Sequence, residues 1–224
     1  MRAGWVTLAA ACSTVAVAVA GTGLPAGAVV GTNSRMTQAK SQAVAEVAAT
    51  KRNTSRRYAR LSVPKAGIRN LSVVRYLGRP DDRAGTTVND RGHAAAPHGR
   101  WGGVGPGQVG NFLLTGHRTS AGAPMSRVPQ LRQGDRIFIT KRNATYVYTV
   151  SSKLWINFRS AQSRARQTAP DPGHPGREAT RSAIVLSTCA TPEDNAAGRR
   201  WRDRFHNPTH RFAIVGYLSG ARFR

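Results

Sequence analysis

Cysteine is scarce in this sequence. Only two of the 224 residues are cysteines, Cys12 and Cys189. Cys12 lies in an apolar N-terminal segment, so the two cysteines cannot build a disulfide framework. Cys189 is therefore expected to carry a free thiol, and such a thiol is either a small packing group or a nucleophile.

Acidic residues are also few, ten in all, and no carboxylate occurs between Asp90 and Asp135. This pattern offers little support for a glycosidase carboxylate pair or a calcium cage. The sequence contains no HExxH or paired-cysteine spacing, no GxSxG elbow and no GxxxxGKS or GxxxxGKT loop. We therefore expect no metal and no cofactor.

Basic residues, by contrast, are abundant. Thirty-four Lys and Arg residues against ten acidic ones give a net charge of +24. Such a charge favours anionic surroundings, which could be phospholipid, an acidic wall polymer or nucleic acid. Because the charge is spread along the chain, it indicates the surroundings of the protein more than a defined site.

The N-terminal 31 residues form an apolar segment. No charged residue occurs between Arg2 and Arg35, and residues 5–20 are almost wholly apolar. The segment is predicted to be an uncleaved membrane anchor or, as the alternative, a cleaved signal peptide. Either interpretation places the rest of the chain outside the cytoplasm, membrane-anchored or secreted, and argues against nucleic acid as a partner.

Residues 32–60 are polar and predicted to be a basic stalk, partly helical around residues 39–49. The run KRNTSRRYAR, residues 51–60, holds five basic residues. It is interpreted as a solvated linker with an electrostatic attraction to anionic headgroups or wall polymer.

From Leu61 onward, short apolar runs alternate with long polar loops. The runs predicted to be strands are LSVPKAGI, LSVVRYLG, NFLLT, RIFIT, ATYVYTVSSKLWI, IVLSTC and RFAIVGYL. The glycine-rich stretch before NFLLT and residues 159–181 are predicted to be loops, and a helical turn is expected around residues 125–131. This pattern favours an all-β antiparallel barrel or sandwich, and periodicity alone does not choose between them.

Three reactive side chains stand at strand ends. His117 follows NFLLT, Cys189 ends IVLSTC, and Arg211 begins RFAIVGYL. Acyl transfer by a cysteine needs a base for the thiol proton and a donor for the oxyanion, roles that His117 and Arg211 could fill. Each also has an ordinary interpretation, as a packing thiol, a turn residue and a surface cation. His210 is a rival base.

The same residues resemble the motifs of a known family. LLTGHRTS resembles the TGH motif of sortases, IVLSTC their TLxTC motif, and RFAIVGYL the strand that carries their essential arginine. GPGQVGNFLLTGHR is similar to actinobacterial sortases of class E. Ser187 departs mildly from the family, which more commonly has threonine there. The resemblance covers residues 61–218, with 219–224 left as a basic C-terminal tail. It implies a closed eight-stranded β-barrel with long loops and one or two short helices.

The resemblance also implies a cysteine transpeptidase. Cys189 would attack the Thr-Gly bond of an LPxTG-like or LAxTG-like sorting signal and form a thioacyl enzyme. His117 would be the general acid and base, and Arg211 would hold the substrate and stabilise the oxyanion. Thr188 would contribute to substrate binding. The acceptor would be an amine of a peptidoglycan precursor or a pilin.

Two alternatives remain open at this point. The barrel could be an exported basic module that binds anionic envelope polymer, or a sortase-like hydrolase without an amine acceptor.

Overall fold

The computed structural model describes residues 36–42, 57–99 and 103–224. The expected anchor or signal peptide, residues 1–31, lies outside these ranges. Residues 51–56 of the basic run 51–60 lie outside them as well. Residues 36–42 form a short exposed helix. They overlap the start of the helix expected over 39–49, the rest of which is not described. Among the described helices, none has the length and apolar character needed to cross a membrane.

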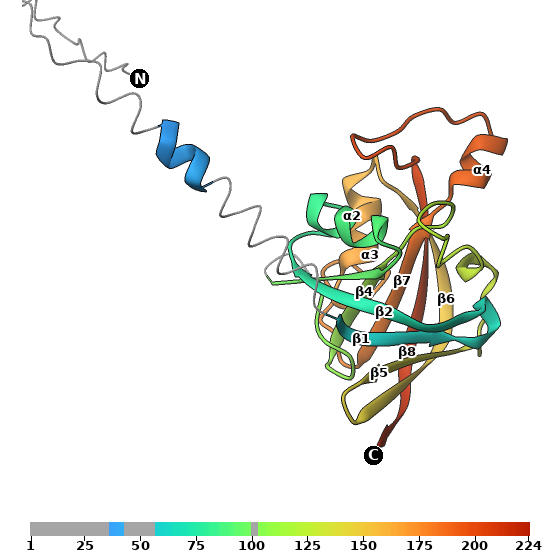
Figure 1. The fold of residues 1–224 in the computed structure, drawn as a ribbon. Helices are drawn as coiled ribbons and strands as arrows, with labels where there is room; N and C mark the ends of the chain where they lie inside the picture. Colours follow the sequence, from blue (N-terminus) through green and yellow to red (C-terminus); the bar gives the residue numbers. More distant parts are fainter. Residues whose placement is uncertain (1–35, 43–56, 100–102) are drawn as a thin grey trace, which may run out of the picture. The chain divides into compact units, whose positions relative to one another are not determined.

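Eight strands close into a barrel in the order β1-β2-β3-β4-β7-β8-β6-β5 (Figure 1). Closure comes from β1 and β5, which pair antiparallel with Arg60 opposite Thr140. This confirms the eight-stranded closed barrel and resolves the choice between barrel and sandwich. The strands are β1 (Arg57–Val63), β2 (Ile68–Leu77), β3 (Ala94–His98), β4 (Gly110–Thr115), β5 (Arg136–Lys141), β6 (Ala144–Asn157), β7 (Ser182–Cys189) and β8 (His210–Phe223).

The two unbroken apolar runs belong to β4 and β7, which are buried along almost their whole length. These strands pair parallel to each other, and buried parallel strands are apolar on both faces. Phe112 and Ile184 point into the main barrel core. Leu113 and Val185 belong to a second apolar cluster. The side-chain alternation of a strand thus supplies two separate apolar layers.

Helix α2 (Arg83–Asp90) and strand β3 lie in the region expected to be one long loop. The helix begins where the Asp82 carboxylate accepts a hydrogen bond from the Gly85 amide at 2.8 Å, an N-cap. Val88, a residue of this helix, is buried against Tyr76 of β2 and Ala95 of β3. Apolar residues are too sparse here for helical periodicity to reveal the helix from sequence.

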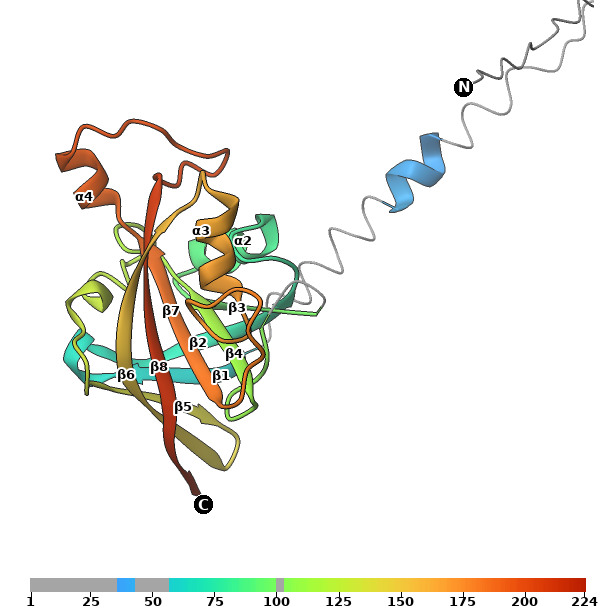
Figure 2. The same ribbon diagram turned by 180° about the vertical axis from the view of Figure 1, so that it is seen from behind.

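Helix α3 (Ala161–Thr168) likewise interrupts the loop expected over 159–181. Ser160 caps it by accepting from the Ser163 amide at 3.2 Å. The Asn111 side chain in β4 donates to the carbonyls of Gln167 and Ala169, at 2.9 and 3.0 Å, and so fixes the end of α3 against the barrel. Figure 2 shows α3 on the side of the barrel formed by β4 and β7.

Two further expectations concern chain segments near turns and ends. A 3-10 turn at Val128–Gln130 confirms the helical turn expected there, and β5 and β6 form the hairpin expected around residues 141–143. The expectation of a basic tail over 219–224 needs correction. Strand β8 continues through Phe223, which pairs with Ala144, because the long β6 offers hydrogen-bonding partners to its end.

Candidate active site

The parallel pair β4–β7 explains why the three predicted side chains meet. Thr115 lies opposite Ser187, so both strands end at the same edge of the barrel. His117, just after the end of β4, and Cys189, the last residue of β7, therefore stand together. Because β8 runs antiparallel to β7, its second residue Arg211 lies opposite Cys189. Three distant parts of the sequence thus converge on one edge.

His117, Thr188, Cys189 and Arg211 line one narrow cavity. Its volume is about 10 Å³, which is room for about one water molecule. This volume is too small for a peptide, although Cys189 itself is partly exposed. We refer to this narrow space as the closed cavity.

The Cys189 thiol is free and donates weakly to the Asn207 Oδ1 atom at 3.5 Å. Burial raises the pKa of Cys189 to about 11; the Arg211 charge lowers this pKa and the Asp81 charge raises it. At neutral pH only on the order of one thiol in ten thousand is then ionised. The resting form of Cys189 is therefore the protonated thiol, and a base must remove its proton before or during attack.

His117 is the imidazole that lines this cavity. Its Nε2 atom lies 2.8 Å from the Asp90 Oδ1 atom, at the end of α2. With Nε2–H donating to the carboxylate, the other ring nitrogen of the neutral imidazole is left as an acceptor. Asp90 therefore orients His117, and the sequence analysis did not single Asp90 out.

Arg211 is 1% exposed, an unusual burial for a cation. Its Nη1 atom donates to the carbonyl oxygens of Pro208 at 2.6 Å and His210 at 3.3 Å. The guanidinium lies over the Phe158 ring at 4.0 Å, and Nη2 is 3.8 Å from an Asp203 carboxylate oxygen. In the described structure, Nε and Nη2 have no hydrogen-bond acceptor. A buried donor without an acceptor is costly, and both atoms are left available as hydrogen-bond donors.

Asp81 is a site residue that sequence reasoning missed. It lines the cavity with Cys189, and its Oδ2 atom is buried without a hydrogen-bond partner among the described residues. Burial raises the pKa of Asp81, while the charge of Arg211 lowers it. The backbone adopts φ of 60° at this residue, a left-handed conformation that costs energy for a residue with a side chain. No motif surrounds Asp81, so only the folded chain reveals its place.

Arg118, next to His117, supports the strand end that carries the cysteine. Its guanidinium makes two hydrogen bonds of 2.9 Å to the Glu193 carboxylate in α4 (Thr191–Ala196). It also donates to the Cys189 carbonyl at 3.4 Å. A bidentate pair of this kind fixes geometry as well as charge. Arg118 therefore ties the loop after β4 to the segment after β7.

The rival base His210 occupies a different environment. Its Nδ1 atom lies 2.7 Å from Asp194 Oδ1, and its backbone amide donates to Asp194 Oδ2 at 2.9 Å. Its ring stacks on Trp155 with centroids 4.8 Å apart. It does not line the cavity that holds Cys189. These contacts give His210 a structural role at the start of β8.

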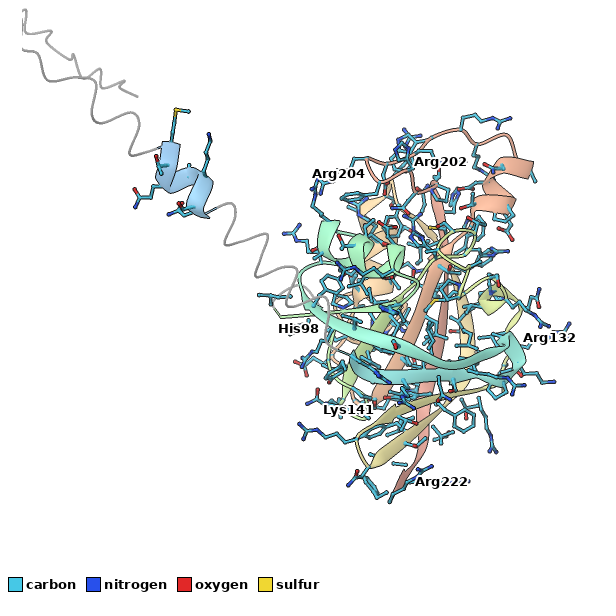
Figure 3. The ribbon with its side chains drawn as sticks, viewed as in Figure 1. His98, Arg132, Lys141, Arg202, Arg204 and Arg222 are labelled. Atoms are coloured by element: carbon cyan, nitrogen blue, oxygen red, sulfur yellow. The ribbon has the colours of Figure 1, made fainter. Side chains whose placement is uncertain are left out.

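Four further arginines lie in the loop between α4 and β8. Figure 3 shows Arg202 and Arg204 on the segment between α4 and β8. Arg204 is exposed, whereas Arg202 is partly covered and donates to the Arg199 and Trp201 carbonyls. None of the four loop arginines, Arg199, Arg200, Arg202 and Arg204, lines the Cys189 cavity.

Fold and cavity together define a class of protein: a closed eight-stranded barrel with a thiol, an imidazole and a guanidinium at the edge where its parallel strands β4 and β7 end. Residues 61–205 match the family model of the sortase domain. Because this match covers more than half of the chain, the protein belongs to the sortase family.

Known sortases resemble this chain in sequence over part of its length, and others resemble it in fold. The chain is 33% identical in sequence to sortase SrtE1 of Streptomyces coelicolor over 86 residues, which are 38% of this chain and 23% of that protein. The match thus spans about a quarter of the length of that curated relative.

Many solved sortase structures share the fold, and two of them illustrate the likeness. The SrtA sortase from Actinomyces oris has a TM-score of 0.57 at 22% identity, covering 76% of this chain and 83% of that one. Sortase E1 from Streptomyces coelicolor, solved with a tripeptide in the active site, has a TM-score of 0.55 at 23% identity, with coverages of 75% and 91%. The class E sortases among these relatives agree with the resemblance seen in the sequence.

Proposed function

We propose that the protein is a transpeptidase that cleaves an LPxTG-like or LAxTG-like sorting signal between Thr and Gly and transfers the threonyl group to an amine. One observation carries this proposal: Cys189, His117 and Arg211 line the same cavity at one barrel edge. A thiol, a base and an oxyanion donor are the groups that acyl transfer by a cysteine requires.

In the first half-reaction, His117 accepts the proton of the Cys189 thiol as the sulfur bonds to the threonyl carbonyl carbon. The carbonyl oxygen becomes negatively charged, and the Nε and Nη2 atoms of Arg211, which lack acceptors in the closed cavity, donate to it. The C–N bond to glycine then breaks. His117 returns its proton to the leaving glycine nitrogen, which leaves a thioester on Cys189.

In the second half-reaction, an acceptor amine attacks the thioester carbonyl and His117 removes its proton. The C–S bond breaks, and the sulfur regains a proton from His117. Since burial raises the pKa of Cys189 to about 11, the protonated thiol is the stable resting form once the thioester has gone.

The closed cavity implies an opening step before the substrate binds. Asp81 and Asn207 line its wall beside the thiol. A substrate carbonyl that reaches Arg211 takes a position beside the Asp81 carboxylate. We propose that the turn carrying Asp81 moves aside to admit the peptide.

The cellular location that we expect for the protein depends on residues 1–31. We propose that this segment holds the enzyme at the outer face of the cell membrane, where surface proteins and peptidoglycan amines are both present. This agrees with the absence of charged residues between Arg2 and Arg35.

The test is a ligation assay with the full chain in a neutral detergent. Peptides carrying LAxTG or LPxTG are incubated with and without triglycine, and the products are separated by chromatography and identified by mass. A peptide joined to triglycine, absent with Cys189→Ala, supports the proposal and ranks the two signals. Cleavage without ligation identifies a hydrolase. If folded protein with a reduced thiol forms neither the ligated nor the cleaved product, the proposal is overturned.

A further inference from the structure

The barrel carries a second and much larger pocket that shares no lining residue with the Cys189 cavity. It has a volume of about 900 Å³ and lies against β1, β2, β5 and the end of β3. This volume falls within the range of sites for small organic ligands, roughly 300–1,000 Å³. Figure 3 shows two of its residues, His98 and Lys141, on the same flank of the barrel.

Six cationic side chains line this pocket, and no carboxylate side chain does so. They are Arg57, Arg60, Arg75, Lys141, Arg142 and Arg224. Across the described ranges, none of them forms an ion pair within 4.0 Å with Asp or Glu. Cations collected without counterions repel one another, so a bound anion would relieve a strongly positive potential.

Strand pairing explains why the cations gather. Arg60 lies opposite Thr140 in the β1–β5 pair, so the β5 residue that follows, Lys141, stands beside the basic start of β1. Arg57 lies opposite Val74 in the β1–β2 pair, which brings Arg75 to the same place. The pocket is thus built from three neighbouring strands of the barrel wall.

Tyr58 holds two of these cations in position. Lys141 Nζ donates to the Tyr58 hydroxyl at 2.9 Å and lies 4.2 Å from the ring centroid. The Arg75 guanidinium lies 5.1 Å from the same centroid. Cation–π contacts of this kind fix the charges before a ligand arrives. The pKa of His98 is lowered, mainly by burial; the hydrogen bond to the Tyr76 carbonyl raises this pKa and the charge of Arg75 lowers it.

We propose that this basic pocket binds a phosphate-bearing anion, either the headgroup of an anionic phospholipid or a soluble phosphate. Guanidinium groups match phosphate oxygens with two parallel hydrogen bonds, and five of the six cations are arginines. Their combined charge exceeds what one carboxylate can balance. The proposal does not depend on the peptide chemistry of Cys189.

The pocket lies at the start of β1, where the basic run of residues 51–60 enters the barrel. Arg57 and Arg60 belong both to that run and to the pocket. The run was expected to be attracted to anionic headgroups, and the pocket supplies a defined place for one phosphate of such a surface.

The test uses the full chain in uncharged detergent and isothermal titration calorimetry. Three probes are titrated: inorganic pyrophosphate, dihexanoyl phosphatidylglycerol, and dihexanoyl phosphatidylcholine as the neutral lipid. Binding of pyrophosphate and phosphatidylglycerol at a single site, with none of phosphatidylcholine, is expected. The tighter of the two ligands shows whether a lipid headgroup or a soluble phosphate fits better.

Two triple variants with the same change of charge locate the site. The pocket variant is Arg57→Gln, Arg60→Gln and Arg142→Gln, three exposed residues without a side-chain hydrogen bond or ion pair in the described structure. The control variant is Arg69→Gln, Arg132→Gln and Arg136→Gln, exposed residues outside the pocket.

The pocket variant should bind both anions roughly 10- to 100-fold more weakly, while the control stays within about twofold of the native chain. Circular dichroism shows that both variants fold. Equal weakening in both variants would mean a diffuse surface charge and would overturn the proposal. Failure of the native chain to bind either anion would overturn it as well.

Discussion

The Thr188 hydroxyl donates a hydrogen bond of 2.8 Å to the carbonyl oxygen of Gly116. The bond joins the residue before Cys189 to the residue before His117, across the ends of the parallel strands β4 and β7. Thr188 is 2% exposed, so water cannot replace this contact. This hydroxyl therefore helps to set the spacing between nucleophile and base, together with the Gly116 amide, which donates to the Ser187 carbonyl at 3.1 Å.

Replacing Thr188 by Val should remove this bond and leave the buried Gly116 carbonyl without its side-chain donor. We expect a loss of about 1–3 kcal/mol in the free energy of unfolding, measured by urea denaturation. The rate of ligation should fall at the same time. Thr188→Ser, which keeps the hydroxyl, is the control and should retain most of both. Equal behaviour of the two variants would show that the hydroxyl has no such role.

His117 and His210 should respond differently to replacement by Gln. His117→Gln should lower kcat by about 10²–10⁴, the usual contribution of a general acid and base. His210→Gln should stay within about tenfold of native kcat and instead lose about 1–3 kcal/mol of stability, because the buried Asp194 loses its imidazole partner. Kinetics with one peptide and triglycine, together with thermal unfolding, distinguish them. The reverse pattern would assign the base to His210.

The reactivity of Cys189 with iodoacetamide should depend steeply on pH. Only the thiolate reacts, and burial raises the pKa of Cys189 to about 11. Below that pKa the thiolate fraction grows about tenfold with each pH unit. The alkylation rate should therefore rise from pH 7 to pH 10 without a plateau. A plateau near pH 7 would show that Cys189 is a stable thiolate.

Two variants should move that pH profile in opposite directions. The Asp81 charge raises the pKa of Cys189, so Asp81→Asn should lower the pKa and speed alkylation at a given pH. The Arg211 charge lowers the same pKa, so Arg211→Gln should raise it and slow alkylation. Mass spectrometry of the carbamidomethylated protein follows both rates. Shifts of the same sign in both variants would contradict this electrostatic account.

Arg211→Lys tests the arrangement of the several N–H donors of the guanidinium rather than its charge. Lysine keeps the charge but cannot place two nitrogens toward an oxyanion while a third donates to Pro208. We expect kcat/KM to fall by about 10²–10³, mainly through kcat, because the oxyanion forms only in the transition state. Steady-state ligation kinetics separate kcat from KM. A change confined to KM would assign Arg211 to substrate binding alone.

The sequence predicts the strands of this site well, and the reason is physical. The runs in β4 and β7 are apolar throughout because both of their faces are buried. Such runs are visible without structure, as are the reactive residues at their ends. The sequence pattern does not show that these two strands pair with each other. It is this pairing that brings His117 and Cys189 together.

Helices and long-range neighbours of the site are harder to predict. Helix α2 depends on the Asp82 cap and on packing of Val88, not on a helical apolar repeat. Asp81 reaches the cavity because the turn before α2 adopts a left-handed backbone at that residue. Both features arise from contacts between segments far apart in the chain. The basic pocket has the same origin, since its cations come from β1, β2, β5, the turn after β5 and the residue after β8.

The most direct test of the account is intact-mass spectrometry of the full chain after brief exposure to a sorting-signal peptide without an acceptor amine. The account predicts a mass increase equal to the peptide up to its threonine, located on Cys189 by proteolytic mapping and removed by added triglycine. Folded protein with a reduced thiol that cleaves the peptide without ever carrying this adduct would contradict it.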